Sequence, residues 1–185
     1  QSRGWFYTLH VLAGALFDRP AFQNVICHGI LLADDGAKLS KKLRNYTEPE
    51  EIFEKQGSDA LRWYYMSANI VRGGDRRISD QGIDDVVRQV LLPIWNAYSF
   101  FTMYANADGI RAEFRTDATS VLDRYALAKT HEFVRSVEDA LEAYDLPAAC
   151  QALRIMIEAG NNWYIRRSRD RFWKKERDDA KKDAY

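Results

Sequence analysis

Apolar and polar positions in the first part of the chain predict a helix, a strand and a turn. Residues 5–17 carry apolar side chains at every third or fourth position, which predicts an amphipathic helix that ends at residues 18–20, where a proline follows two charged residues. Residues 24–33 form a nearly continuous apolar run, which predicts a buried strand. The Asp-Asp-Gly sequence at 34–36 is typical of a turn. This order of elements indicates part of an α/β sheet.

The next part of the chain predicts a polar loop and two short helices. Residues 38–44 contain four basic residues and no acidic residue, so we expect an exposed basic loop. Thr47 and Glu50 have the spacing of a capping box, which predicts the start of a short helix, and Ser58 is expected to cap the next one. Residues 71–75 contain two glycines and predict a loop.

The second half of the chain has the apolar periodicity of long helices. Ser79 is expected to cap the first helix, and Pro93 is expected to kink it. A loop at 108–119, a second helix at 121–144 and a third helix from residue 145 to beyond Trp163 complete an α-helical bundle. The first helix carries an apolar stripe that we expect in the core: Ile83, Val86, Val90, Ile94, Ala97, Phe101 and Tyr104.

The whole pattern predicts an α/β segment followed by an all-α bundle. We place residues 1–78 in the first part and residues 79–185 in the second, with the boundary after the glycine-containing loop. The chain begins without Met and ends without a helix-stop signal, so we expect both ends to lie inside a longer protein.

Composition and charge exclude several classes of protein. With 185 residues, 46% of them hydrophobic, the chain can bury a core, which excludes a disordered polypeptide. The 27 basic residues balance 27 acidic ones, so any nucleic-acid site must depend on local charge. Cys27 and Cys150 lie far apart, which excludes a disulfide scaffold and the usual structural zinc motifs. No run of 18 apolar residues is present, and we expect a cytoplasmic protein without a membrane partner.

The clearest candidate chemistry lies in the basic loop, at Lys38-Leu39-Ser40-Lys41-Lys42. Two lysines three residues apart, beside the end of a strand, can place ammonium groups on a triphosphate whose leaving group gains charge during transfer. A solvated loop without such a role is the alternative, because short lysine-rich loops are common.

The context of this loop resembles a known family. The chain contains, in order, QSRGWF, VICHGILLADDG and KLSKKLRNYTEPEEIFEKQGSDALRWYYMS. This series resembles the C-terminal half of the catalytic domain of class I aminoacyl-tRNA synthetases, and KLSKK stands in the place of the family's KMSKS loop. The isoleucine-specific branch is also similar at RGWFYTLHVLA, RGGD, LLPIWNAYSFFTMYA and NNWYIRRSRDRFW. The resemblance implies the C-terminal part of a Rossmann-like catalytic domain, followed by the start of an anticodon-binding α-helical domain.

The resemblance implies roles for the residues of the basic loop. Lys38 and Lys41 match the motif lysines and are expected to neutralise ATP phosphates while the carboxylate of isoleucine attacks the α-phosphate. Ser40 matches the motif serine and is expected to shape the loop. Lys42 replaces the final serine of the family motif, which leaves the role of that position open.

Four further residues match positions around the nucleotide and the amino acid. His28 and Gly29 match the strand end against which the nucleotide lies, and a glycine lets the backbone approach closely. Trp5 matches the aromatic wall of the amino-acid pocket, and Gln1 matches a polar residue beside it. From burial statistics alone, Trp5 is more typical of a core residue.

The resemblance also implies substrates and partners. The whole enzyme would use L-isoleucine, ATP with Mg2+ and tRNA(Ile), and we expect it to be a monomer with no protein-bound metal in this segment. The family's HIGH motif and its editing domain lie outside this sequence, so we expect this chain alone to be inactive. Two alternatives stay open: a valyl, leucyl or methionyl relative, and a non-catalytic helical module that binds tRNA.

The C-terminal segment carries an excess of positive charge. Residues 166–182 contain nine basic and four acidic residues, and aromatic residues are interleaved with the arginines. Such a mixture can hold phosphates and stack on bases, although a solvated face is the simpler explanation. The candidate tRNA contacts are Arg166, Arg167, Arg169 and Arg171.

Overall fold

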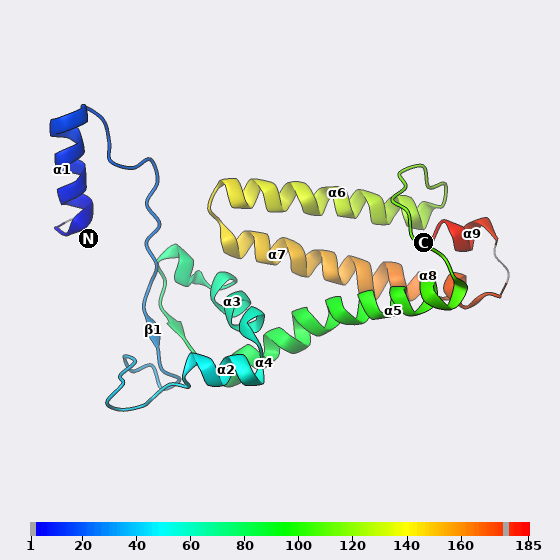
Figure 1. Cartoon of the computed structure of the whole chain (residues 1–185), viewed down its shortest axis with the longest axis horizontal. Coiled ribbons are helices and arrows are strands. Elements are labelled where there is room, and N and C mark those ends of the chain that lie inside the picture. Colours follow the sequence, from blue (N-terminus) through cyan, green and yellow to red (C-terminus); the bar gives the residue numbers. More distant parts are fainter. Residues whose placement is uncertain (1–2, 176–177) are drawn as a thin grey trace.

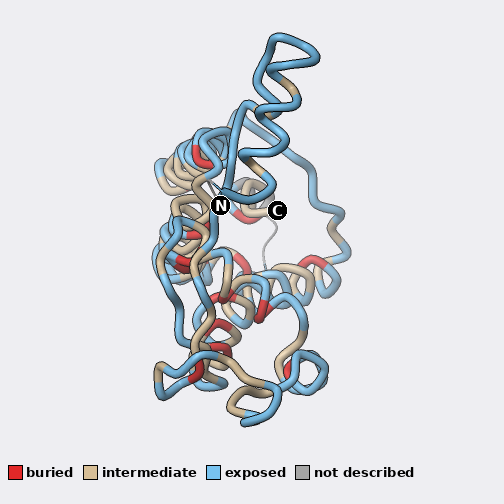
Figure 2. Tube along the Cα trace, turned by 90° about the vertical axis from the view of Figure 1, so that its left-hand side faces the viewer, coloured by how far each residue is buried: buried red, intermediate tan, exposed pale blue. Residues whose placement is uncertain are grey.

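The computed structural model describes residues 3–175 and 178–185. Figure 1 shows an elongated molecule, with helix α1 (Trp5–Phe17) at one side and long helices at the other. The predicted helix at 5–17 is confirmed, but none of its residues is buried. Figure 2 shows the same separation, with exposed α1 projecting from the part of the chain that holds the buried residues. No described helix combines the length and the apolar character needed to span a membrane.

The predicted buried strand at 24–33 is wrong for most of its length. Only Leu31–Leu32 forms a strand, β1, which pairs in parallel with β2 (Arg76–Arg77). Val25, Ile26 and Ile30 are 43–57% exposed. A strand is stable only beside partner strands, and the described chain supplies one short partner, so residues 24–30 are extended without a ladder.

The turn and the basic loop that follow β1 are confirmed, whereas the two predicted caps are displaced by one residue. The amide of Gly36 donates to the carbonyl of Ala33 at 2.8 Å, and residues 38–44 form no helix or strand. Helix α2 (Pro49–Lys55) has Glu48 as its N-cap, because proline begins the helix at its first position. Helix α3 (Ser58–Met66) is preceded by Gly57 as N-cap. Thr47 instead donates to the Asp80 carboxylate at 3.0 Å.

A compact core joins the first half of the chain to the start of the long helices. The 3-10 helix η1 (Asn69–Arg72) precedes β2, and α4 (Asp80–Val86) begins at Ser79, whose hydroxyl accepts from the Gly82 amide at 3.2 Å as a cap. The predicted cap at Ser79 is therefore confirmed. Residues from α2, α3, α4 and the π-helical segment that follows α4 form this core: Ile52, Ala60, Leu61, Tyr64, Ile83, Val86 and Val90. The core includes residues from both sides of position 78, and the boundary proposed there stays a prediction.

The predicted helical bundle is confirmed. Figure 1 shows α6 and α7 running side by side, and α5 converging on the continuation of α7, where it contacts η3. The helix of α4 continues through a π-helical segment, η2, into α5, and the third long helix continues through a second one, η3, into α8. The bounds of these elements are η2 (Val87–Leu91), α5 (Leu92–Asp108), α6 (Val121–Glu142), α7 (Leu146–Ile157), η3 (Glu158–Ile165), α8 (Arg166–Trp173) and α9 (Asp179–Lys182).

The apolar stripe of the first long helix does not stay in the core. Ile83, Val86 and Val90 are buried, whereas Ile94 is 42% exposed, so the prediction for Ile94 is wrong. Farther along the stripe, Ala97, Phe101 and Tyr104 are half-buried, so the exposed position falls in the turn that follows the π-helical segment. Pro93, which was expected to kink this helix, lies at the start of α5, directly after the π-helical segment.

Candidate nucleotide and RNA sites

The end of the extended segment before β1 lies against the turn before β2. The amide of Gly29 donates to the Ile70 carbonyl at 2.8 Å, and the amide of Ile30 donates to the Asp75 carboxylate at 2.9 Å. A Cβ atom on Gly29 would lie 2.1 Å from the carbonyl oxygen of Gly74, so this position requires glycine. Two predicted sequence features, residues 28–29 and the RGGD segment, therefore form one structural unit.

His28 is exposed beside this contact, and its ring has a defined orientation. Its Nδ1 atom lies 2.7 Å from the carbonyl oxygen of Gly29. A carbonyl oxygen only accepts, so Nδ1 carries the proton in this contact and Nε2 of the neutral ring is left as an acceptor. The unit thus presents the exposed imidazole of His28 beside a glycine whose side-chain space is filled by the Gly74 backbone.

The lysine loop starts beside β1. Lys38 forms an isolated antiparallel bridge with Leu32, so the loop begins beside the end of that strand. Lys38, Lys41 and Lys42 are exposed, and Ser40 is half-buried. The hydroxyl of Ser40 accepts from the Leu43 amide at 3.4 Å. The loop therefore presents three ammonium groups on a short turn next to a strand end.

Asn45 holds this loop, and the sequence pattern did not identify it. Its Oδ1 atom accepts from the Ser40 amide at 2.9 Å, and its Nδ2 atom donates to the Lys38 carbonyl at 3.2 Å. One side chain thus fixes the backbone at two points of the loop. Asparagine often bonds backbone groups in turns, and its place just after the lysines was the available signal.

Trp5 is not a core residue of the described chain. It is the first residue of α1 and is 75% exposed, whereas Phe6 and His10 pack on Phe22, with ring centroids 5.6 and 5.9 Å apart. The core alternative for Trp5 is therefore wrong in this structure, and its indole is open to a ligand or to another part of a protein. Gln1 lies outside the described residues.

Arg171 is engaged inside the bundle. Its guanidinium donates to both carboxylate oxygens of Asp123, at 2.6 and 2.8 Å, and to the Ala180 carbonyl at 2.8 Å. Asp123 is 4% exposed and also accepts from the Tyr164 hydroxyl at 2.9 Å. Burial and the neighbouring carboxylate raise the pKa of Tyr164 to about 12. A phosphate contact at Arg171 would have to break this buried pair.

The other three candidate arginines are exposed. Arg166, Arg167 and Arg169 lie on α8, and the guanidinium carbon of Arg167 is 3.7 Å from the ring centroid of Trp163. Trp163 and Trp173 are 45% and 55% exposed, whereas the neighbouring Phe172 is buried and packs on other aromatic rings. The surface open to RNA is therefore smaller than the charged segment suggested.

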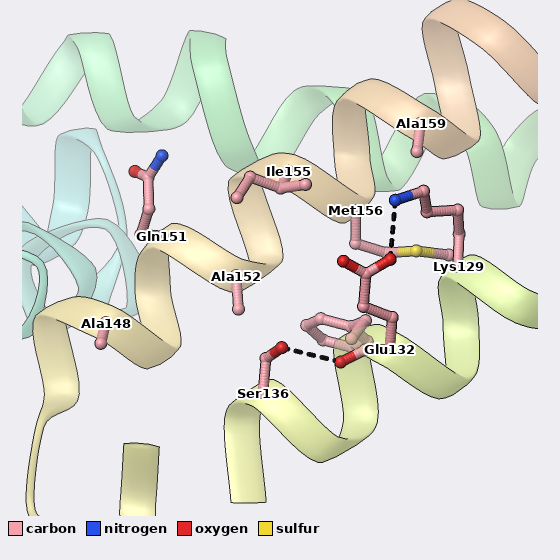
Figure 3. A pocket seen from close by; sticks show the side chains of 10 residues that line it. Lys129, Glu132, Ser136, Ala148, Gln151, Ala152, Ile155, Met156 and Ala159 are labelled. Carbon is pink, nitrogen blue, oxygen red and sulfur yellow. Dashed lines mark hydrogen bonds and ion pairs between the residues drawn. The ribbon is translucent and has the colours of Figure 1, made fainter. Parts of the chain in front are cut away.

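A groove between α6 and α7 is separate from these candidates. Figure 3 shows that its walls come from the two helices and the start of η3. Lys129 and Glu132 form an ion pair of 2.6 Å at its rim, and Phe133, Ile155 and Met156 line it. None of the candidate residues lines this groove. Within residues 3–175 and 178–185, no group of three or more His, Cys, Asp or Glu residues is placed to hold a metal ion.

The structure has a lysine loop beside a parallel strand pair, followed by a helical bundle with a basic aromatic segment. Comparisons to family models agree with this arrangement. Residues 1–78 match the model of tRNA synthetases class I (I, L, M and V). Residues 123–185 match the model of the anticodon-binding domain of tRNA ligase. The chain belongs to the class I tRNA synthetases.

Within this family the similar curated relatives carry one name. The isoleucine–tRNA ligase of Mycobacterium tuberculosis is 54% identical over 178 residues, which are 96% of this chain and 17% of that protein. The isoleucine–tRNA ligase of Wolbachia pipientis wMel is 52% identical over 187 residues and matches 100% of this chain. The chain spans about 17% of the length of these relatives. The resemblance to the isoleucine-specific branch is therefore confirmed.

A solved structure shows the same fold. LeuRS of Agrobacterium radiobacter, in a ternary complex with tRNA and LeuAMS, superposes with a TM-score of 0.68. The match covers 83% of this chain and 20% of the other, at 21% sequence identity.

Proposed function

We propose that this chain supplies the ATP loop and the first part of the anticodon-binding domain of an isoleucine–tRNA ligase. The enzyme would join L-isoleucine to ATP to give isoleucyl-adenylate and then transfer the isoleucyl group to tRNA(Ile). The observation that carries the proposal is the 52–54% identity, over nearly the whole chain, to proteins of that name. The remaining steps would belong to parts of the enzyme outside this sequence. The cytoplasm is the compartment we propose, because charging serves translation there.

In the proposed activation step, a carboxylate oxygen of isoleucine attacks the α-phosphorus of Mg-ATP. A new oxygen–phosphorus bond forms, the bond to the oxygen that bridges to the β-phosphate breaks, and pyrophosphate leaves. Negative charge grows on this leaving group, and the exposed ammonium groups of Lys38 and Lys41 are suited to stabilise it. We assign the larger effect in the transition state to Lys41.

The loop must hold its shape for these charges to act. Asn45 bonds the backbone at Ser40 and Lys38, which supports a fixed path for the loop. Preorganised charges stabilise a transition state more than mobile ones, because no free energy is spent on orienting them during the reaction. Ser40 contributes through its own contacts within the turn.

We propose that His28 and Gly29 form the edge against which the nucleotide lies. The exposed imidazole of His28 and the fixed backbone at Gly29 support this role. The parallel pairing of β1 with β2 is consistent with a Rossmann-like catalytic domain in residues 1–78, and the anticodon-binding domain would occupy residues 79–185. Trp5, with its exposed ring, and Gln1 would border the amino-acid pocket.

For tRNA, we propose Arg166, Arg167 and Arg169 as phosphate contacts. Trp163, stacked under Arg167, extends this surface with a ring on which a base could stack. Arg171 is assigned to the stability of the bundle, because its charge is paired with Asp123.

The proposal is tested by replacing neighbouring lysines of the loop in a full-length enzyme that carries this chain. Lys41→Ala is expected to lower the rate of isoleucine-dependent ATP–pyrophosphate exchange by about 100-fold or more, the usual effect of removing one transition-state charge contact. The affinity for tRNA should be nearly unchanged. Lys42→Ala is the matched control, because it removes an equally exposed charge at the position that departs from the motif.

Equal exchange rates for Lys41→Ala and the unchanged enzyme would overturn the role of Lys41. A modest loss of tRNA affinity with a shallower salt dependence, and no exchange activity in either protein, would instead indicate a module that only binds RNA.

A further inference from the structure

The bundle touches the first half of the chain through a paired arginine and aspartate. Arg72, the last residue of η1, donates from Nε to Oδ1 of Asp145 at 3.1 Å, and its terminal nitrogen donates to both carboxylate oxygens. The two residues are 73 positions apart in the sequence. A guanidinium that bonds a carboxylate at two points fixes orientation as well as distance.

Asp145 has a second, local role at the same time. It is the N-cap of α7, and its carboxylate accepts from the Ala148 amide at 3.1 Å. The Arg72 guanidinium and the Ala148 amide together hold the pKa of the Asp145 carboxyl below its usual value. Because the carboxylate is anchored to its own helix, the ion pair acts on the whole of α7 and not on a mobile side chain.

The turn that presents Asp145 has an unusual backbone. Tyr144 adopts a φ of 57°, in the left-handed region that is unfavourable for a bulky residue. Such a conformation persists where the surrounding structure holds it. The turn between α6 and α7 is therefore shaped to place Asp145 against η1.

On its other side, Arg72 is joined directly to the proposed nucleotide edge. Gly73 and Gly74 follow it, and the carbonyl of Gly74 lies against Gly29. The carbonyl of Ile70, two residues before Arg72, accepts from the Gly29 amide at 2.8 Å. The path from α7 to Gly29 therefore consists of one ion pair and a short stretch of hydrogen-bonded backbone.

Helix α7 is attached to the first half of the chain at two separate points. Its N-terminus is tied to η1 by Asp145, and at its C-terminus Ile157 packs against the core cluster of α2, α3 and α4. The helix also contacts α3. The continuous helix of α4, η2 and α5 also joins the two halves, and the ion pair adds a directional contact at the N-terminus of α7.

We propose that the Arg72–Asp145 pair positions the helical bundle relative to the ATP-loop half, so that tRNA held by the bundle presents its acceptor end to the adenylate. This inference rests on the proposed function. Both residues are positioning residues: Asp145 lies in the bundle, and the side chain of Arg72 bonds Asp145 although its backbone belongs to the unit at the nucleotide edge. Loss of the pair from the bundle side, at Asp145, should affect the tRNA-dependent step and leave amino-acid activation unchanged.

The test uses a full-length enzyme carrying this chain, with isoleucine, ATP and tRNA(Ile) as substrates. Arg72→Ala and Asp145→Asn are made singly and together. Asparagine keeps an oxygen that can cap α7 and removes only the charge. We expect kcat/KM for tRNA in aminoacylation to fall between about 5-fold and 150-fold, the range of ordinary coupling between sites. For Asp145→Asn, which lies in the bundle, ATP–pyrophosphate exchange without tRNA should stay within about twofold, well below that range.

Non-additivity is the sharper criterion. If the two residues act through one another, the double variant should be no worse than either single variant. Arg62→Ala is the matched control, because Arg62 forms an exposed ion pair with Asp59 within α3, at 2.9 Å, and should leave both activities unchanged.

Three results would overturn the proposal: unchanged aminoacylation in the variants, additive losses in the double variant, or equal losses in exchange and aminoacylation. The last result would indicate general damage to the fold. Failure of the proposed function itself would look different, because the unchanged enzyme would then show no isoleucine-dependent exchange.

Discussion

Gly29 and Gly74 meet backbone to backbone, at a distance that leaves no room for a side chain on Gly29. A Cβ atom there would lie 2.1 Å from the Gly74 carbonyl oxygen and 2.4 Å from its carbonyl carbon. This contact joins the segment before β1 to the turn before β2. It explains physically why a glycine is needed beside His28, whatever ligand the edge receives.

Gly29→Ala is therefore expected to open the contact. Overpacking against rigid backbone costs about 1–3 kcal/mol, because neither chain segment can move without losing its hydrogen bonds. Amide hydrogen exchange of residues 28–32 should become faster, and exchange of the α6 and α7 amides should not change. Unaltered protection around Gly29 would contradict the prediction.

Gly14→Ala is the control for this substitution. Apart from the backbone of its own helix, no described atom would lie within 4 Å of a Cβ atom on Gly14. Alanine in a helix interior should stabilise α1 by about 1 kcal/mol, so the exchange of residues 28–32 should stay as it is in the unchanged protein.

Asn45→Ala is expected to loosen the lysine loop, because it removes both side-chain hydrogen bonds to the loop backbone. With about 1 kcal/mol for each bond, kcat/KM for ATP in pyrophosphate exchange should fall at least tenfold. Asn45→Asp keeps the acceptor for the Ser40 amide and loses the donor to Lys38, so its effect should be smaller. Asn96→Ala, at an exposed position of α5, serves as the control. If Asn45→Ala behaves like Asn96→Ala, Asn45 does not hold the loop.

The raised pKa of Tyr164 predicts a loss of stability in alkaline solution. In the unfolded chain the phenol ionises around its ordinary value of 10.0, whereas in the folded protein it ionises at about 12. The folded state therefore keeps its proton longer, and the stability due to this group is complete below pH 10 and is lost as the pH rises toward 12. Thermal unfolding followed against pH should show this loss, and Tyr164→Phe should reduce it. An identical alkaline profile for that variant would show that the phenol does not carry the effect.

Substitution of Arg171 should lower the stability of the bundle, whereas substitution of Arg169 should lower the affinity for tRNA. Arg171→Ala leaves the buried carboxylate of Asp123 without its cation, which is expected to destabilise the bundle by about 3–5 kcal/mol. Arg169→Ala changes an exposed side chain, so stability should stay within about 0.5 kcal/mol. Its affinity for tRNA should fall, with a salt slope lower by about one. Chemical denaturation and tRNA titration at several salt concentrations would measure both. The prediction fails if Arg171→Ala leaves the denaturation midpoint unchanged.

The helices were largely predictable because their hydrogen bonds are local. The periodicity of residues 5–17 and of the second half was enough to locate α1, α6 and α7 within a few residues. The strand was not predictable in the same way, because a strand depends on partners elsewhere in the chain. Arg76 and Arg77, which had no strand pattern, pair with Leu31 and Leu32, while most of the apolar run at 24–33 has no strand partner among the described residues.

The candidate site was likewise predictable only where its features depend on residues close together in the sequence. The order of the motifs was sufficient to identify the family and the lysine loop, and the family models agree with it. Asn45 could not be selected from its spacing alone, because its bonds depend on the path of the loop. Arg171 looked equivalent to its neighbours in the basic segment until Asp123, 48 residues away, was found to bind it.

By itself, the sequence determined what depends on neighbours along the chain: the helices, the turn at Gly36, the exposed lysine loop and the membership of a tRNA synthetase family. The tertiary structure alone decided which charges are free and which are paired, which glycine meets another backbone, and how Asp145 ties the bundle to η1. The physical reason is that these contacts join residues far apart in sequence, so they form only when several elements pack together.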